Sequence, residues 1–223
     1  LSRTNLKTDE ASEKKIFDFL DNLHKQASSY GGAVLSIIGN HELMNVMGDM
    51  RYASPMSIKD FGTIYDRIDA FKPGGEIARR FACTRNVIIK IGNFLFVHGG
   101  ILPKHCKLSI QEINRIMKNY LLNKINTENH KYFDQLFLEE NSLLWTRKLS
   151  GENVKCSKLN KVFKTYNVNN IVVGHTPQLN GITSECSNKI WRVDTGMSRA
   201  FSNKPIIQVL EILDNGMAKK SNN

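Results

Sequence analysis

Three short apolar runs in this sequence each end in a turn that carries glycine and histidine. With their turns they occupy residues 33–42, 94–100 and 171–177, which end in the sequences GNHE, HGG and GHTP. Apolar runs of this length without alternation are typical of strands buried on both faces of a parallel sheet. Because open α/β sheets place ligands at the carboxyl ends of their strands, the pattern predicts polar turns gathered along one sheet edge.

Helical patterns separate these strands along the chain, as in an α/β fold. The predicted helices are residues 8–28 (with Ile16, Phe19, Leu20 and Leu23 on one face), 57–82 with a break at 73–75, 109–122, 128–140 and 158–166. Further strands are predicted at 86–91, 191–193 and 206–212. The dipeptide Gly92-Asn93 predicts a tight hairpin between two strands, which makes the sheet mixed.

Length and composition fit one domain, residues 1–213, followed by a polar tail, residues 214–223, that we expect to fray. The net charge of +10 comes from 31 basic and 21 acidic residues spread along the chain. We therefore expect a lysine-rich surface and no nucleic-acid partner. Apolar runs stay well short of the roughly 18 residues of a membrane helix, so we expect no membrane partner.

The four cysteines, Cys83, Cys106, Cys156 and Cys186, form no CxxC pair, so zinc-finger spacing is absent. A chain of this length does not need a disulfide framework in order to fold. We therefore expect four reduced thiols and a cytoplasmic location.

The polar side chains of the three turns suit metal-dependent chemistry. Asn40 offers a carbonyl oxygen, and neutral imidazoles such as those of His98 and His175 are common ligands for zinc, iron and manganese. Glycines let the backbone turn sharply and approach a metal or a phosphate. Glu42 could cap its turn or orient His41. One such turn alone could be a capped polar loop, but three in the same context favour a site.

As a set, these motifs resemble the calcineurin-like metallophosphoesterases, and most closely their Shewanella-like protein phosphatase branch. Residues 45–52, 144–147 and 191–198, with the sequences NVMGDMRY, LWTR and WRVDTGMS, carry the resemblance to that branch. The resemblance covers residues 9–212. It implies a four-layer α/β metallophosphoesterase fold, in which two mixed sheets pack together between helices.

The resemblance also implies roles for single residues. Asn40, His98 and His175 would bind one ion of a divalent pair, manganese, iron or zinc. His41 would act as the general acid beside the leaving-group oxygen. The pair of ions would activate a water or hydroxide for attack on phosphorus.

Arginines would bind the phosphoryl oxygens, because a planar guanidinium matches them in a fork. Arg51 and Arg147 are the candidates, and for each the alternative is a surface salt bridge. His24, His105 and His130 match no motif of the family, so we interpret them as structural residues that lie at the surface or are partly buried.

Two family motifs, GDxHG and GDxxDRG, have no counterpart in these 223 residues. In the family they supply ligands of the first metal, the bridging carboxylate, the carboxylate beside the GNHE histidine and one phosphate-binding arginine. The sequence therefore predicts an N-terminally truncated domain that lacks one βαβ unit. We expect a polypeptide of these residues alone to be inactive.

For the intact protein, the resemblance implies metal-dependent hydrolysis of phosphate monoesters. A protein phosphorylated on Ser, Thr or Tyr is the expected substrate, and a small phosphorylated molecule is an alternative. A catalytically dead binding protein of the same fold is a second alternative. A nuclease or cyclic-nucleotide diesterase of the superfamily is disfavoured, because Pro177 stands where many such enzymes carry a second histidine.

Overall fold

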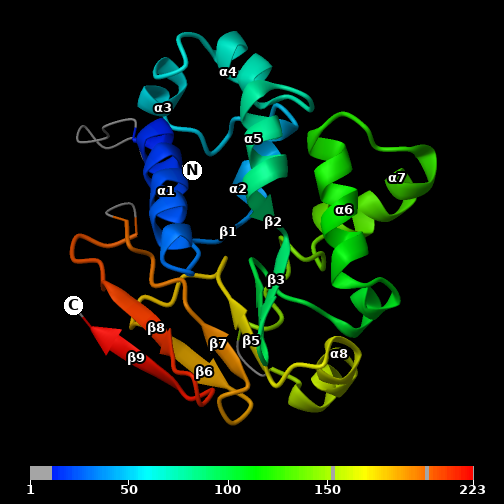
Figure 1. Ribbon diagram of the computed structural model, residues 1–223, viewed down its shortest axis with the longest axis vertical. Helices are drawn as coiled ribbons and strands as arrows, with labels where there is room; N and C mark the ends of the chain where they lie inside the picture. Colours follow the sequence, from blue (N-terminus) through cyan, green and yellow to red (C-terminus); the bar gives the residue numbers. More distant parts are fainter. Residues whose placement is uncertain (1–11, 152–153, 199–200, 223) are drawn as a thin grey trace. The chain divides into compact units, whose positions relative to one another are not determined.

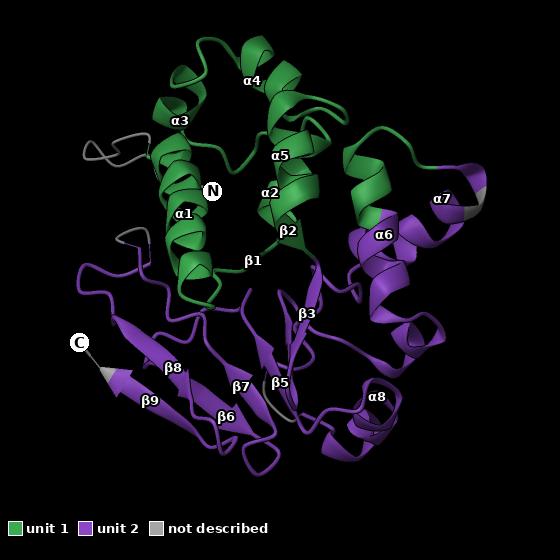
Figure 2. Cartoon of the chain, in the orientation of Figure 1, with its two compact units in different colours: residues 1–86, 117–125 green, residues 87–116, 126–223 purple. Residues whose placement is uncertain are grey.

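The computed structural model describes residues 12–151, 154–198 and 201–222 of the chain (Figure 1). The chain divides into two compact units, coloured separately in Figure 2. Unit 1 comprises Leu1–Asn86 and Met117–Ile125, and unit 2 comprises Val87–Ile116 and Asn126–Asn223. The predicted domain of residues 1–213 thus contains parts of both units, and its boundaries stay a prediction.

Unit 1 is mostly helical. Its elements are α1 (Glu13–Ser29), β1 (Ser36–Ile37), α2 (Asn40–Val46), α3 (Pro55–Lys59), α4 (Ile64–Phe71), α5 (Glu76–Thr84) and β2 (Arg85–Asn86). The helix predicted over residues 57–82 with a break at 73–75 is three helices. The predicted break separates α4 from α5, and a capping box of Thr63 and Asp66 starts α4 after the end of α3. Of the predicted helix 8–28, residues 8–11 lie outside the described part.

The strand predicted over residues 33–38 is shorter and less buried than expected. Only Ser36–Ile37 are assigned as strand, in parallel pairing with β2. Leu35 is exposed and Ile38 is buried. The apolar run was interpreted as buried on both faces, yet in the described part of the chain β1 has only β2 as a strand neighbour.

Unit 2 contains a mixed five-stranded sheet in the order β3-β4-β5-β7-β6. Its strands are β3 (Ile88–Ile91), β4 (Phe94–Val97), β5 (Asn170–Val173), β6 (Thr183–Glu185) and β7 (Ile190–Arg192). β3 and β4 form the predicted hairpin around Gly92, whose φ is +54°. β4–β5 and β5–β7 pair in parallel, which confirms the buried parallel strands expected from the apolar runs.

The remaining helices follow the predicted pattern with local differences. They are the 3-10 turn η1 (Pro103–Lys107), α6 (Ile110–Leu121), α7 (Thr127–Phe133), the π-helical turn η2 (Asp134–Leu138), the 3-10 turn η3 (Cys156–Leu159) and α8 (Asn160–Tyr166). The helix predicted over 128–140 therefore changes to π-helical hydrogen bonding after Phe133. Within the described residues, no helix is both long and apolar enough to cross a membrane.

The end of the chain differs from the prediction. β8 (Gln208–Ile212) and β9 (Ala218–Asn222) form a separate antiparallel sheet, so β8 does not complete the five-stranded one. Leu210 and Ile212 pack against the core cluster around Trp191, and this burial holds the hairpin beside the sheet (Figure 1). The expectation that residues after Asp214 fray is wrong for residues 218–222.

A disulfide joins Cys156, at the start of η3, to Cys186 in the turn between β6 and β7. The prediction of four reduced thiols is wrong for this pair, while Cys83 and Cys106 are free. The two cysteines are 30 residues apart in sequence, with Cα atoms 5.5 Å apart. Such a pairing depends on the fold and has no signature in the sequence.

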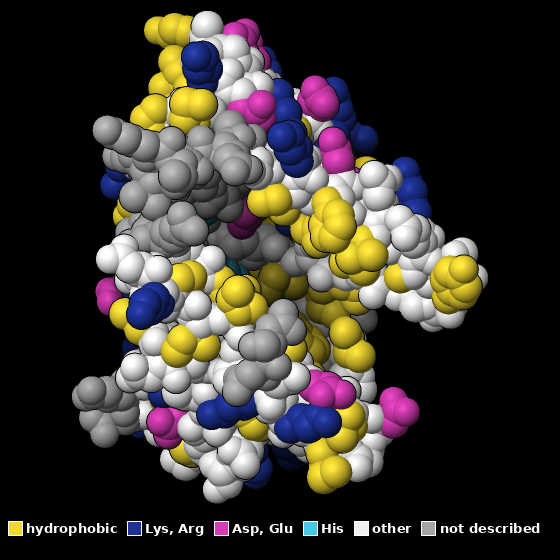
Figure 3. Space-filling model, turned by 90° about the vertical axis from the view of Figure 1, so that its left-hand side faces the viewer, with side chains coloured by type: hydrophobic (Ala, Val, Ile, Leu, Met, Phe, Trp, Pro, Cys, Tyr) yellow, Lys and Arg dark blue, Asp and Glu magenta, His cyan; other side chains and the backbone are white. Residues whose placement is uncertain are grey.

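Basic side chains are dispersed over the face shown in Figure 3, where acidic side chains lie among them. This distribution agrees with the expected lysine-rich surface.

Candidate active site

Asn40 and His41 form the first turn of α2 in unit 1. Gly39 precedes them in an extended conformation, and its N–H donates to the Glu42 carboxylate at 2.8 Å. Glu42 thus caps the turn, which is one of the two roles considered for it. Asn40 is buried. The His41 ring stacks on Tyr52, with centroids 4.9 Å apart and planes at 20°.

His98 and His175 come together in unit 2 because β4 and β5 are parallel neighbours. Val97 and Val173 are register partners, so the next residues leave the sheet side by side. The Gly174 N–H donates to the His98 carbonyl at 2.8 Å. His98 Nε2 then lies 3.2 Å from His175 Nδ1. Of the strand-end turns expected to meet, these two do so within one unit.

The two facing nitrogens lie at hydrogen-bond distance from each other, and the same separation would suit two ligands of one metal ion. A metal–imidazole bond is about 2.1 Å long, and two such bonds span a 3.2 Å separation at an angle of about 100°. His175 has a φ of +65°, a conformation that non-glycine residues rarely adopt and that clusters at functional sites. In the described part of the chain, no group of three or more His, Cys, Asp or Glu residues is placed to hold a metal ion.

Arg147 forms hydrogen bonds with the turn that carries His175. Its Nη1 donates to the His175 carbonyl at 3.0 Å and to the Thr176 hydroxyl at 2.9 Å. The Ser150 hydroxyl donates to the same Thr176 oxygen at 2.7 Å. Trp145 packs edge-on against the His175 ring, with centroids 5.8 Å apart. The exposed Arg147 side chain is therefore anchored beside the histidine pair, rather than paired with a carboxylate of the described residues.

Arg51 makes the surface salt bridge that was the alternative to phosphate binding. Its Nε and Nη2 donate to the two Asp49 oxygens at 2.9 and 2.6 Å, and its side chain is 73% exposed. Hydrogen bonding from Arg51 lowers the pKa of Asp49. A phosphate would have to compete with this carboxylate for the guanidinium.

His24 and His130 lie at the surface as predicted, whereas His105 is more deeply buried than the predicted surface or partly buried position. His105 is buried, and its Nδ1 accepts the Leu102 N–H at 3.0 Å. The exposed His24 accepts the Val34 N–H at 3.2 Å through its Nδ1. His130 is exposed on α7.

Sequence reasoning missed three residues that contact the candidate side chains: Asn45, Tyr52 and Trp145. Asn45 donates to the His41 carbonyl at 2.9 Å, Tyr52 stacks on the His41 ring, and Trp145 contacts His175. All three lie in the segments 45–52 and 144–147 that carry the resemblance. Only the arginines of those segments had a chemical argument in their favour.

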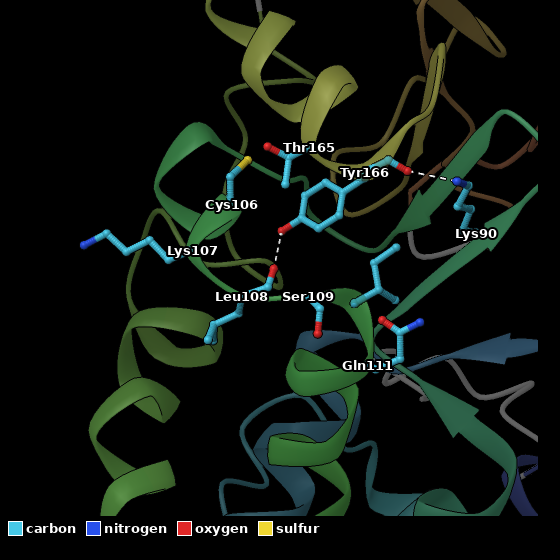
Figure 4. A pocket seen from close by; sticks show the side chains of 9 residues that line it. Lys90, Cys106, Lys107, Leu108, Ser109, Gln111, Thr165 and Tyr166 are labelled. Carbon is cyan, nitrogen blue, oxygen red and sulfur yellow. Dashed lines mark hydrogen bonds between the residues drawn. The ribbon is translucent and has the colours of Figure 1, made fainter.

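A concave region of unit 2, of about 400 Å³, lies between η1, α6 and α8 (Figure 4). The Tyr166 hydroxyl lies 3.1 Å from the Leu108 carbonyl, and Lys90 donates to the Tyr166 carbonyl at 3.0 Å. Burial raises the pKa of the Cys106 thiol, which keeps it protonated and unreactive. Because these polar groups bind one another, we interpret the region as structural.

Comparison with known proteins identifies the family of the chain. Residues 6–179 match the sequence profile of the calcineurin-like phosphoesterases. The chain belongs to this family, and both the predicted resemblance and the α/β metallophosphoesterase fold are confirmed.

Three similar proteins show how much of each is shared. Shewanella-like protein phosphatase 1 of Plasmodium berghei is 34% identical over 211 residues, which covers 89% of this chain and 57% of that protein. Uncharacterized protein R398 of Acanthamoeba polyphaga mimivirus is 34% identical over 238 residues, which covers 88% of this chain and 94% of that protein. The cold-active protein-tyrosine phosphatase of a psychrophilic Shewanella species superposes with a TM-score of 0.71 at 26% identity. The match covers 92% of this chain and 64% of that protein.

Proposed function

We propose that the protein to which this chain belongs is a two-metal phosphatase that hydrolyses phosphate monoesters. The observation that carries the proposal is the pair of imidazole nitrogens 3.2 Å apart at the ends of β4 and β5, in a chain of the calcineurin-like phosphoesterase family. A phosphorylated protein is the proposed substrate, because similar proteins are named as protein phosphatases. A small phosphorylated molecule is the alternative.

The chain's own residues would hold and surround the metal. Asn40, His98 and His175 are proposed as ligands of one of two divalent ions, manganese, iron or zinc. When bound, the ions would supply the Lewis acidity that activates water and offsets the negative charge of the phosphoryl oxygens. Arg147, fixed through Nη1 to the turn of His175, keeps further N–H groups that suit phosphoryl oxygens. Arg51 is a second candidate for this role.

His98→Ala and His175→Ala test the ligand assignment. In the protein expressed from its complete reading frame, each variant should lose bound metal and most hydrolysis of 4-nitrophenyl phosphate with manganese. His130→Ala is the matched control, because it removes an exposed histidine that belongs to none of the motifs. Wild-type turnover in both variants would refute the assignment. Phosphopeptide binding without turnover in the wild-type protein would instead favour a non-catalytic binding protein.

We further propose His41 as the proton donor to the leaving-group oxygen. Stacking on Tyr52 restrains the orientation of its ring. His41→Ala should lower kcat by about 100- to 10,000-fold for alkyl phosphates, which need a proton on the leaving group. The loss should be much smaller for 4-nitrophenyl phosphate, and metal content should stay close to that of the wild type. Equal losses for both kinds of substrate would rule His41 out as the acid.

A further inference from the structure

Arg67 is a fully buried cation on α4 of unit 1. Its side chain is 0% exposed, and its Nη1 lies 2.9 Å from a carboxylate oxygen of Glu13, itself 5% exposed. Nη1 also donates to the carbonyl and hydroxyl of Ser57 at 3.0 Å, and Nε donates to Asn45 Oδ1 at 2.9 Å. A buried ion pair contributes little to stability compared with apolar packing, so stability alone does not explain this arrangement.

Two aromatic rings fix the plane of the guanidinium. Its central carbon lies 4.9 Å from the ring centroid of Phe61 and 4.7 Å from that of Phe71. Cation–π contacts of this kind hold an arginine over a ring face. The hydrogen-bonding edge of Arg67 is therefore held in a fixed direction, toward side chains from α1, α2 and α3.

The Asn45 amide connects Arg67 to the peptide group of His41 through two hydrogen bonds. Arginine can only donate, so the Asn45 oxygen must face Arg67, and the Asn45 NH₂ group must face the other way. That group donates to the His41 carbonyl at 2.9 Å, and Asn45 is 2% exposed. The order of contacts is thus guanidinium, amide, then the peptide group of His41.

Helix α2 needs such an anchor. It has seven residues, which is too short for a helix to be stable by its own hydrogen bonds. The first turn of this helix carries both Asn40 and His41. A shift of about 1 Å in a group that acts on the substrate can lower a rate about 100-fold.

We propose that Arg67 and Asn45 are positioning residues that set the place of the His41 imidazole at the active site. The inference rests on the proposed function, because it gives His41 a task for which position matters. Neither residue needs to touch the substrate. All of the contacts that support the proposal lie within unit 1.

Asn45→Asp is the sharpest test, because it keeps the shape and the oxygen that faces Arg67 but removes the donor to the His41 carbonyl. We expect kcat for alkyl phosphates to fall about 10- to 100-fold with little change in KM. The loss for 4-nitrophenyl phosphate should be smaller, as for His41→Ala. A merely structural defect would lower both rates equally.

The His41→Ala background gives a second readout. If Asn45 acts through His41, adding Asn45→Asp to His41→Ala should cause almost no further loss. Independent, multiplying losses would overturn the proposal. Because Asn45→Asp buries a charge, Glu13→Gln/Arg67→Met provides a second variant that removes both members of the ion pair together. It should show the same dependence on the leaving group.

Arg80→Met serves as the control arginine. Arg80 pairs with Asp18 and Asp21 on α1, away from the contacts of Asn45, and its loss should leave the dependence on the leaving group unchanged. The NMR signal of the His41 ring provides a readout that does not require turnover, and it should shift in Asn45→Asp but not in Arg80→Met. An inactive wild-type protein would refute the proposed function alone. An unshifted His41 signal would refute the positioning role whether or not the protein is active.

Discussion

At the scale of single residues, His105 shows how burial fixes a charge state. The side chain is 3% exposed, and its Nδ1 accepts the Leu102 N–H. Burial, with a smaller contribution from Lys104, lowers the pKa of His105 to about 4, although the Asn141 backbone and the Glu139 carboxylate act in the opposite direction. Protonation would also place a hydrogen on Nδ1, directly against the Leu102 donor.

The lowered pKa of His105 predicts a loss of stability in acid. Between about pH 6.5 and pH 4, the unfolded chain binds a proton on His105 that the folded chain does not, so the free energy of unfolding falls as the pH falls. We expect this histidine to account for about 3 kcal/mol of the loss. Urea denaturation at several pH values should show a flatter pH dependence for His105→Gln. Matching profiles for His105→Gln and the wild type would contradict the prediction, and the exposed His130→Gln is the control.

The sequence predicts which residues have metal-binding chemistry, but it does not predict which residues support them. His98 and His175 stand out because each follows an apolar run and lies beside glycine, and the parallel register then brings them together. Asn45 and Arg67 have no such signature. Their significance comes from hydrogen bonds between residues 22 apart in sequence, which no local pattern encodes.

At the scale of elements, the apolar strands were predictable and the polar ones were not. β4 and β5 were predicted to within one residue, because burial requires an apolar run. β6 (Thr183–Glu185) and β9 (Ala218–Asn222) were missed, because neither is an apolar run. Helix α1 was predicted, but Ile16 and Phe19 on its expected apolar face are exposed while Phe17 is buried. The hydrophobic periodicity thus predicted the helix, but it did not predict which face of the helix is buried.

The disulfide joins a residue that precedes β5 in the sequence to a residue that follows it. Cys156 and Cys186 enclose β5 and the turn that carries His175. The turn at Cys186 also holds Ser187 and Asn188, and all three have left-handed backbone conformations, with φ of 55°, 55° and 64°. Such conformations are unfavourable for non-glycine residues, so the covalent bond helps to hold this turn.

Removal of the disulfide should destabilise unit 2. Cross-linking residues 30 apart restricts the unfolded chain, and we expect Cys156→Ser/Cys186→Ser to lower the free energy of unfolding by about 2–4 kcal/mol. A reducing agent should lower the urea midpoint of the wild type and leave that of the double variant unchanged. Cys83→Ser is the control, because that thiol is exposed and free. Thiol counting that finds four free cysteines in the folded protein would contradict the pairing.

At the scale of the whole molecule, the order of three motifs was sufficient to identify the family. Residues 6–179 match its profile, and the fold agrees with that of a solved phosphatase over 92% of the chain. The division into two compact units was not predictable. Hydrophobic patterning shows where helices and strands lie, but it does not show which of them pack with one another.

The last prediction concerns a polypeptide of these 223 residues. Its proposed metal ligands, Asn40, His98 and His175, are all neutral, so they supply no negative charge to offset a divalent cation. Neither GDxHG nor GDxxDRG occurs in the sequence, and the described residues contain no cluster of three or more His, Cys, Asp or Glu residues placed to bind a metal. We therefore expect less than one bound ion per chain and no hydrolysis of aryl phosphates, because two-metal hydrolysis needs both ions.

Metal analysis after dialysis against manganese, zinc or iron measures the number of bound ions per chain. Release of 4-nitrophenol measures the hydrolysis of an aryl phosphate. The same polypeptide with His98→Ala and His175→Ala sets the background for adventitious binding. Because two imidazole nitrogens 3.2 Å apart can still chelate weakly, we expect the unsubstituted polypeptide to bind slightly more metal than this background. Two tightly held ions with turnover would show that residues within these 223 complete the site, and that the carboxylates attributed to the two motifs come from elsewhere in the chain.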